Sequence, residues 1–119
     1  MIVALAIGLL GGIGSVARFA VHRGITREDP SAFPLGTFIV NMLGAFGIGI
    51  LYGANADREL TLLIGLGFLG GFTTFSTWMF ESERLNIDGY PVAAVRNIAF
   101  STAIGFLGVV AGVALGQAA

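Results

Sequence analysis

A glycine pair followed by four hydroxyl side chains lies in an uncharged run that extends from Leu60 to Phe80. The glycines are Gly70 and Gly71, and the hydroxyl residues are Thr73, Thr74, Ser76 and Thr77. Glycine weakens a helix, and a buried hydroxyl needs a hydrogen-bond partner where there is no water. Backbone that leaves the helix at membrane depth is tolerated only where protein or a polar cavity covers it. The segment therefore predicts a broken membrane helix that belongs to an ion site or pathway.

Two further polar tracks are expected to converge on this break. Thr37 and Asn41 lie four residues apart and Gly44 follows three later, so the three share one face of a helix. Asn97 and Ser101 repeat the spacing of four in a later run. Each of these side chains could instead only bond a neighbouring helix or its own preceding turn. Three polar tracks that meet at a broken helix nevertheless favour a pathway.

Acidic and basic side chains are absent from the middle of every uncharged run. Proton-coupled carriers generally need a titratable carboxylate inside the membrane, and no Asp, Glu or Lys lies within these runs. An enzyme is not expected, because His22 lies at a predicted loop edge and Ser76 has no base near it in the sequence.

The composition indicates an integral, multi-pass protein of the cell membrane. The chain has 119 residues, a mean hydropathy of +0.89, 55% hydrophobic residues, six basic and seven acidic side chains. A net charge of −1 gives no basic surface for nucleic acid. Because there is no cysteine, disulfides, thiolate metal sites and thiol catalysis are excluded together.

Four uncharged runs predict an all-α fold with four transmembrane helices in a single domain, residues 1–119. The spans are expected at about residues 2–21, 33–55, 60–80 and 93–117, with the third helix broken. The links are short, so consecutive helices should be antiparallel neighbours. Many of the 19 glycines repeat at a spacing of four, which lets membrane helices approach closely. Because so small a bundle encloses little space, an oligomer, most simply a dimer, is expected.

Residues 70–77 of the third run, together with residues 67–69 before them, resemble the third-helix signature of the Fluc (CrcB-type) fluoride channels. Residues 34–37 and 41–44 are similar to the family's second-helix motif, and residues 14–19 to its first-helix motif. The resemblance covers the whole chain. It implies a small dual-topology channel that assembles as an antiparallel dimer, with two fluoride pores and a central structural sodium ion at the breaks of the third helices.

The resemblance also implies a function, passive and selective export of fluoride that protects against its toxicity, and a set of site residues. Asn41 matches the pore asparagine and Phe75 a pore phenylalanine, whereas Trp78 stands where many members have a second phenylalanine. The expected pore residues are Asn41, Phe75, Trp78, Ser76, Thr77, Thr37 and Ser101. The backbone carbonyls of Gly70 and Thr73 from both subunits would bind the sodium ion.

Elementary chemistry agrees with such a site. Fluoride is small and strongly hydrated, so a selective pore must replace water with close hydrogen-bond donors, without a buried cation that would trap the ion. Amides and hydroxyls are such donors. The edge of an aromatic ring is also positive, because the ring quadrupole places negative charge on the faces.

The arrangement of the partners stays open, as do two other classes of membrane protein. Five arginines lie on one predicted side of the membrane and Arg58 alone on the other, which by the positive-inside rule places both termini outside. A dual-topology homodimer should show almost no such bias, so a heterodimer with a related chain is the alternative. A small multidrug-type exporter should have a glutamate in its first helix, and residues 1–17 contain none. A purely structural subunit of a larger complex would leave the hydroxyl-rich break without a purpose.

Overall fold

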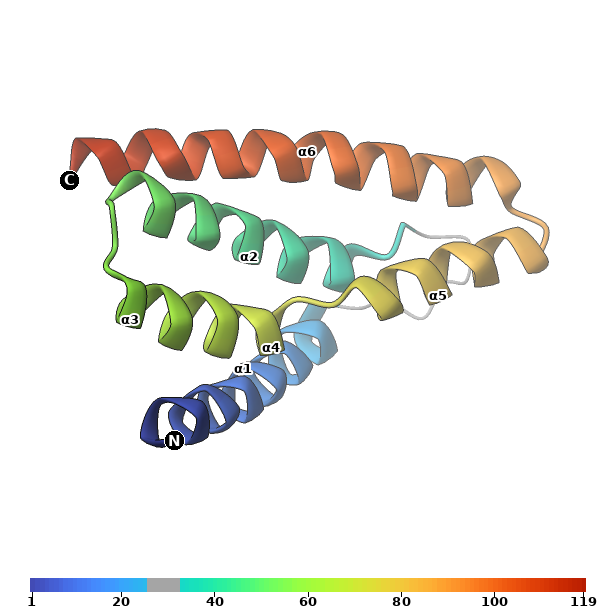
Figure 1. Ribbon diagram of the computed structural model, residues 1–119. Helices are drawn as coiled ribbons and strands as arrows, with labels where there is room; N and C mark the ends of the chain where they lie inside the picture. The colour runs from blue at the N-terminus through green and yellow to red at the C-terminus, as the bar shows by residue number, and fades with distance from the viewer. Residues whose placement is uncertain (26–32) are drawn as a thin grey trace.

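The computed structural model describes residues 1–25 and 33–119, and within them four helices are long and apolar enough to cross a membrane. They are α1 (Ile2–Ile25), α2 (Leu35–Gly53), an interrupted helix over Arg58–Ile87, and α6 (Pro91–Ala118) (Figure 1). The described part of the chain contains no strand, which confirms the expected all-α class. Much of the link between the first two spans, with Arg27, lies outside the described residues.

The third helix consists of α3 (Arg58–Leu60), the π-helix η1 (Thr61–Leu69), α4 (Gly70–Phe72) and α5 (Phe75–Ile87). The backbone is extended at Thr73, with φ −84° and ψ 161°, and at Thr74, with φ −149° and ψ 115°. The predicted break is therefore confirmed. Its position differs from the expected unwinding between Gly70 and Thr73, because the glycine pair is helical. Threonine is β-branched and suits extended backbone, so the two threonines take the break.

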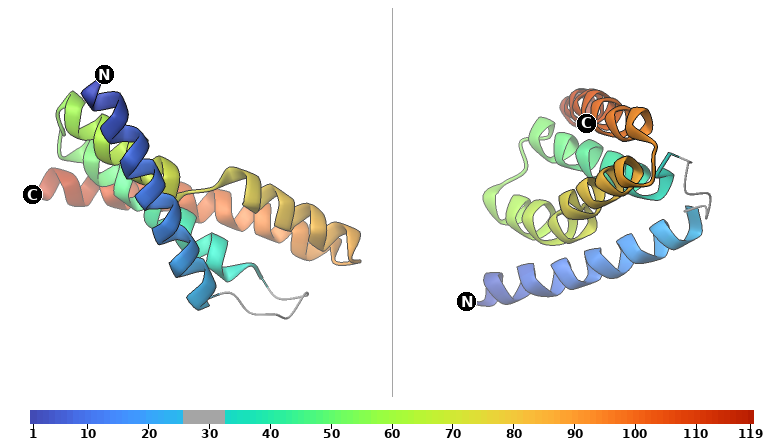
Figure 2. Two further views of the ribbon diagram at one scale, coloured as in Figure 1. Left: turned by 90° about the horizontal axis from the view of Figure 1, so that it is seen from below. Right: turned by 90° about the vertical axis from the view of Figure 1, so that its right-hand side faces the viewer.

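The two halves of the third helix pack on different partners. The half before the break, η1 and α4, packs chiefly on α1, whereas α5 packs on α6. Figures 1 and 2 show α2 and α6 side by side, with α5 diverging from α4 toward the start of α6. The break thus lets the third helix pack on α1 with its first half and on α6 with its second half. Between these two contacts it passes across the face of α2.

Glycines bring the helix pairs into close contact, as their spacing predicts. An added Cβ would overlap the backbone of the facing helix at four positions between α2 and α6, namely Gly49, Gly53, Gly112 and Gly116. The first half of the third helix approaches α1 in the same way, because a Cβ at Gly71 would overlap the Gly11 carbonyl. Gly8 and Gly12, which also repeat at a spacing of four, face open space in the single chain.

The third helix continues past Phe80, so the residues that follow it are helical and do not form the expected link over residues 81–90. The connection to α6 is reduced to residues 88–90, where Gly89 has a φ of 92° that favours glycine. This extension places Glu81 and Ser82 on the same helix as the residues of the break.

Candidate functional site

One face of α2 contacts the third helix at its break and at Glu81 in the helix that follows. Its three residues are Thr37, Asn41 and Gly44, and each meets a different part of that helix. The Thr37 hydroxyl donates to the Glu81 carboxylate, and Asn41 bonds to the backbone of the break. At Gly44 the absent side chain leaves room for the methyl group of a threonine in the break. The shared face predicted from the sequence is therefore used as a docking face for the break.

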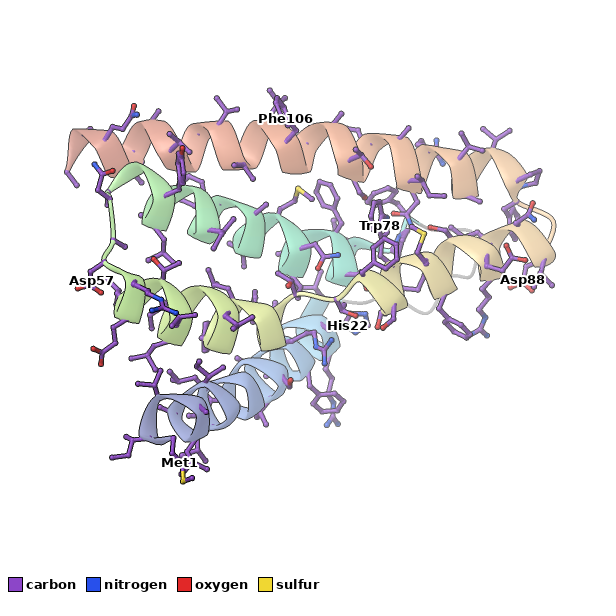
Figure 3. The ribbon with its side chains drawn as sticks, in the orientation of Figure 1. Met1, His22, Asp57, Trp78, Asp88 and Phe106 are labelled. Carbon is purple, nitrogen blue, oxygen red and sulfur yellow. The ribbon has the colours of Figure 1, made fainter. Side chains whose placement is uncertain are left out.

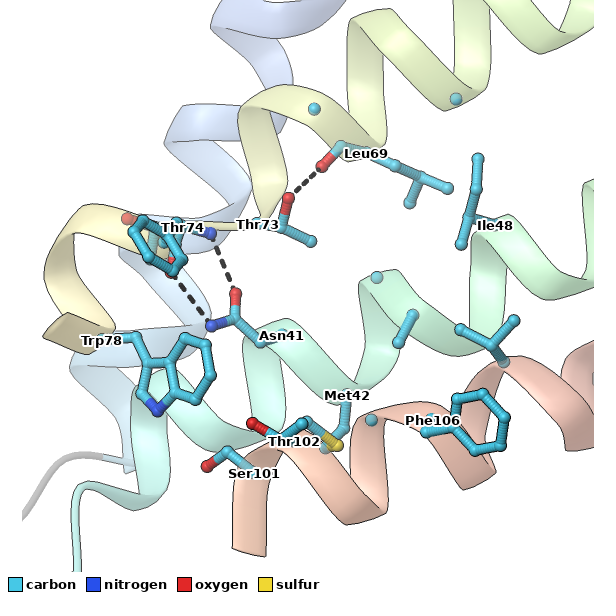
Figure 4. A pocket seen from close by; sticks show the side chains of 17 residues that line it. Asn41, Met42, Ile48, Leu69, Thr73, Thr74, Trp78, Ser101, Thr102 and Phe106 are labelled. Atoms are coloured by element: carbon cyan, nitrogen blue, oxygen red, sulfur yellow. Dashed lines mark hydrogen bonds between the residues drawn. The ribbon is translucent and has the colours of Figure 1, made fainter. Parts of the chain in front are cut away.

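The side-chain amide of Asn41 replaces a missing helical hydrogen bond. Its Oδ1 accepts from the Thr74 N–H at 2.9 Å, and its Nδ2 donates to the Thr74 carbonyl at 3.0 Å (Figure 4). In a continuous helix the Thr74 N–H would bond to the carbonyl of Gly70. The second hydrogen of the Asn41 amide nitrogen is not used in this pairing. It remains a donor beside the break.

Hydroxyl groups satisfy other backbone groups that the break releases. Thr74 caps α5, because its Oγ1 accepts from the Thr77 N–H at 3.2 Å, and it also donates to the Thr77 hydroxyl at 3.1 Å. Ser76 lies beside this cap, with its Oγ 3.5 Å from the Thr74 Oγ1. From α1, Ser15 donates to the Gly71 carbonyl at 3.3 Å. Ser76 and Thr77 thus lie at the capped start of α5.

A groove with a volume of about 690 Å³ runs beside the break over α2 and α6. Four of the predicted pore residues line it, namely Asn41, Phe75, Trp78 and Ser101. At one end of the view in Figure 4 lie the polar residues of the break, and at the other lie Ile48 and Phe106. None of the described residues that line the groove is charged.

Phe75 and Trp78 form an edge-to-face pair at the polar end of the groove. Their ring centroids are 5.8 Å apart and their planes are inclined by 81°. Phe75 is 70% exposed in the single chain. The pair therefore presents aromatic ring surface toward whatever fills the groove.

Thr37 lies away from the groove, in a small polar cluster that the sequence analysis missed. Its side chain is 1% exposed, and its hydroxyl is committed to Glu81. His22 lies in the last turn of α1 (Figure 3). Its Nε2 lies 4.0 Å from the other oxygen of the Glu81 carboxylate. Glu81 follows Trp78 by three residues, and this helical spacing was the available signal. A carboxylate thus does contact one of the predicted polar tracks.

The carbonyls expected to bind sodium are those that the break releases. The Gly70 carbonyl loses the Thr74 N–H to Asn41, and the Thr73 carbonyl loses the Thr77 N–H to the Thr74 hydroxyl. Both residues also line the groove. Hard monovalent cations prefer oxygen ligands, and free carbonyls at membrane depth need a partner. The donor set therefore fits a cation.

Comparisons with known proteins point to one family. The family model for the CrcB-like protein, Camphor Resistance (CrcB), matches residues 5–113. The curated "Fluoride-specific ion channel FluC 2" of Mycobacterium tuberculosis (strain ATCC 25618 / H37Rv) is 48% identical over 105 residues, which cover 87% of this chain and 83% of the relative. "Fluoride-specific ion channel FluC 1" of Carboxydothermus hydrogenoformans is 43% identical over 89 residues, 75% of this chain and 72% of the relative. "Fluoride-specific ion channel FluC" of Geobacter sulfurreducens is 41% identical over 114 residues, 92% of each chain.

Proposed function

The chain belongs to the CrcB family, and from this membership we propose that it is a fluoride-selective channel that exports fluoride passively and so protects the cell from it. The family is one of ion channels and not of enzymes. No proton or nucleotide coupling is proposed, because selectivity in a narrow pore can come from fixed donors and ring edges alone.

The observation that supports this function best is the convergence of Asn41, Phe75, Trp78 and Ser101 on one uncharged groove beside the broken helix. Asn41 has one amide hydrogen left after its pairing with Thr74, so it can donate to an anion without releasing the break. The Phe75–Trp78 pair adds aromatic edges, whose hydrogens are positive. We propose that a dehydrated fluoride ion passes between these groups.

A second copy of the chain would close the groove. In the single chain the groove is open, and large apolar side chains such as Phe75 and Phe106 are each 70% exposed. The backbone carbonyls that the break releases beside the groove are unfavourable in lipid, which offers them no hydrogen-bond partner. An antiparallel homodimer with dual topology is the proposed assembly, and a heterodimer with a related chain is the alternative that the arginine asymmetry leaves open.

A structural sodium ion between the two copies is part of the proposal. The released carbonyls of Gly70 and Thr73 would hold it, and Gly70 is exposed in the single chain, as a site shared with a second copy requires. When bound, the ion would neutralise these carbonyls and tie the two breaks together. Asn41 and the Thr74 cap hold the backbone open whether or not a cation is present, because their bonds lie within one chain.

Fluoride efflux from liposomes that contain this chain alone tests the function and the assembly together. With a cation ionophore present to balance charge, the proteoliposomes should release fluoride quickly and retain chloride. No pH gradient should be needed. Equal fluoride and chloride fluxes, or a requirement for a pH gradient, would contradict the proposal. Activity that requires a second, related chain would select the heterodimer.

A further inference from the structure

A buried hydrogen-bond network joins α5 to α6 behind the polar end of the groove. Asn97 Nδ2 donates to Ser82 Oγ at 2.7 Å, and Ser82 in turn donates to the Trp78 carbonyl at 2.9 Å. The Ser101 hydroxyl donates to Asn97 Oδ1 at 3.3 Å. Since the single hydrogen of Ser82 is used on Trp78, Ser82 must accept from Asn97, which fixes the orientation of the Asn97 amide.

Asn97 is the centre of this network and does not itself reach the groove. It is 1% exposed, and both ends of its amide are occupied by the two serines. Two of the residues that it holds, Trp78 and Ser101, do line the groove. Its role therefore differs from that of Asn41, whose amide has a free hydrogen beside the break.

The indole N–H of Trp78 is also used within the network. Nε1 donates to the backbone carbonyl of Asn97 at 3.4 Å. The Trp78 ring is thus bonded to the backbone of α6, while the Asn97 amide and the Ser82 hydroxyl tie the same two helices together. With its N–H turned into α6, the side chain meets the groove by its ring, as a phenylalanine would.

We propose that Asn97 is a positioning residue of the ion path: its buried amide holds the Ser101 side chain in place and, through Ser82, ties α5 to α6 so that the Trp78 ring stays at the groove. This inference rests on the proposed fluoride conduction. When a buried amide is removed, the buried groups that it bonded lose their partner, which is costly to the fold and lets those groups move. Removing the Asn97 amide should therefore impair conduction without touching the groove.

A double-mutant cycle on fluoride efflux separates positioning from general destabilisation. Asn97→Leu and Ser101→Ala should each lower the flux, the former by roughly tenfold. The double variant should match the worse single variant within about twofold, because Asn97→Leu already removes the group that holds Ser101. Val95→Ala, at a 66% exposed site two residues earlier on α6, is the matched control and should conduct normally. Additive losses in the double variant would overturn the inference.

Trp78 provides a readout that does not depend on transport, because it is the only tryptophan of the chain. Asn97→Leu keeps the backbone carbonyl that accepts from the indole N–H, but it removes the amide link between α5 and α6. It should therefore shift the Trp78 emission and lower its anisotropy as α5 loosens from α6. Ser82→Ala should do the same, since it deletes the link from the Asn97 amide to α5; this variant carries the test if Asn97→Leu does not assemble. Unchanged Trp78 fluorescence, or changed fluorescence with normal fluoride flux, rejects the positioning role. A parent chain without fluoride flux, both alone and together with a related chain, rejects the proposed function itself, which is a different result from an active parent with additive variants.

Discussion

The side-chain amide of Asn41 and the backbone of Thr74 form two reciprocal hydrogen bonds, of 2.9 Å and 3.0 Å, in the middle of the third membrane helix. An amide is suited to this position because it donates and accepts at once, as a neighbouring peptide unit would. The pairing explains how extended backbone survives at membrane depth, where released polar groups cannot be hydrated. It also leaves a single amide hydrogen for an ion in the groove.

Asn41→Asp should lower fluoride flux by at least about 100-fold, because it places a negative charge in an anion path at membrane depth. The carboxylate also cannot donate to the Thr74 carbonyl, so the break loses one of its two bonds. Asn41→Ser keeps a small donor and should retain part of the flux. Efflux from liposomes measures both. Wild-type rates in a correctly assembled Asn41→Asp protein would mean that Asn41 does not line the path.

Gly44→Ala should destabilise the fold by about 1–3 kcal/mol, since the new methyl group would overlap Cγ2 of Thr73. Thr73→Ser removes that methyl group and keeps the hydroxyl that donates to the Leu69 carbonyl at 2.9 Å. Gly44→Ala combined with Thr73→Ser should therefore recover most of the lost stability. Thermal unfolding in detergent, followed by the monodisperse fraction, checks this. If Thr73→Ser gives no rescue, the break does not dock on Gly44.

Phe75→Ile should reduce fluoride flux severalfold to about tenfold, because it keeps apolar volume but deletes an aromatic edge. Phe106→Ile is the matched control: both side chains are 70% exposed and both line the groove, but Phe106 lies at its apolar end. Phe106→Ile should affect the assembly of the protein as much as Phe75→Ile does, but it should leave the selectivity for fluoride intact. Equal losses of fluoride flux in the two variants would assign Phe75 to packing alone.

Sodium removal should abolish most of the activity and weaken the dimer, because the Gly70 and Thr73 carbonyls would be left without a partner. The protein is prepared throughout in a large organic cation in place of sodium, and efflux and particle size are measured before and after sodium is returned. Recovery on return is expected. Full activity and an intact dimer in the sodium-free preparation would reject the sodium site.

Opposite orientations of the chain should be detectable with one introduced cysteine, because the natural sequence has none. Glu59→Cys lies in the exposed turn before η1 and spares Asp57, whose Oδ1 caps α3 by accepting from the Leu60 N–H at 2.8 Å. In intact cells an impermeant thiol reagent should label about half of the chains in an antiparallel homodimer. All-or-none labelling would instead indicate a fixed orientation and a related partner chain.

The sequence by itself determined the four spans and the interruption of the third. Long uncharged runs predict spans because they are long enough to cross the hydrocarbon core of the bilayer. Gly70-Gly71, followed closely by two threonines, predicts the interruption because glycine weakens a helix. Helical spacing also placed Thr37, Asn41 and Gly44 on one face. These inferences depend on neighbours in the chain, which a single sequence reveals.

Only the tertiary structure decided which polar groups are free and which are committed. Asn41 meets Thr74, and Trp78 meets Asn97, across 33 and 19 residues of sequence. The turn of α5 toward α6 puts Thr37 against Glu81 and away from the groove, although the sequence assigned that threonine to the pore. The position of the break, too, was settled by packing: Gly71 is pressed against α1 and stays helical, while Asn41 supplies the bonds that hold Thr74 extended. Such pairings depend on how the helices dock, because a hydroxyl or amide has the same local preference whether it faces a neighbour or a pore.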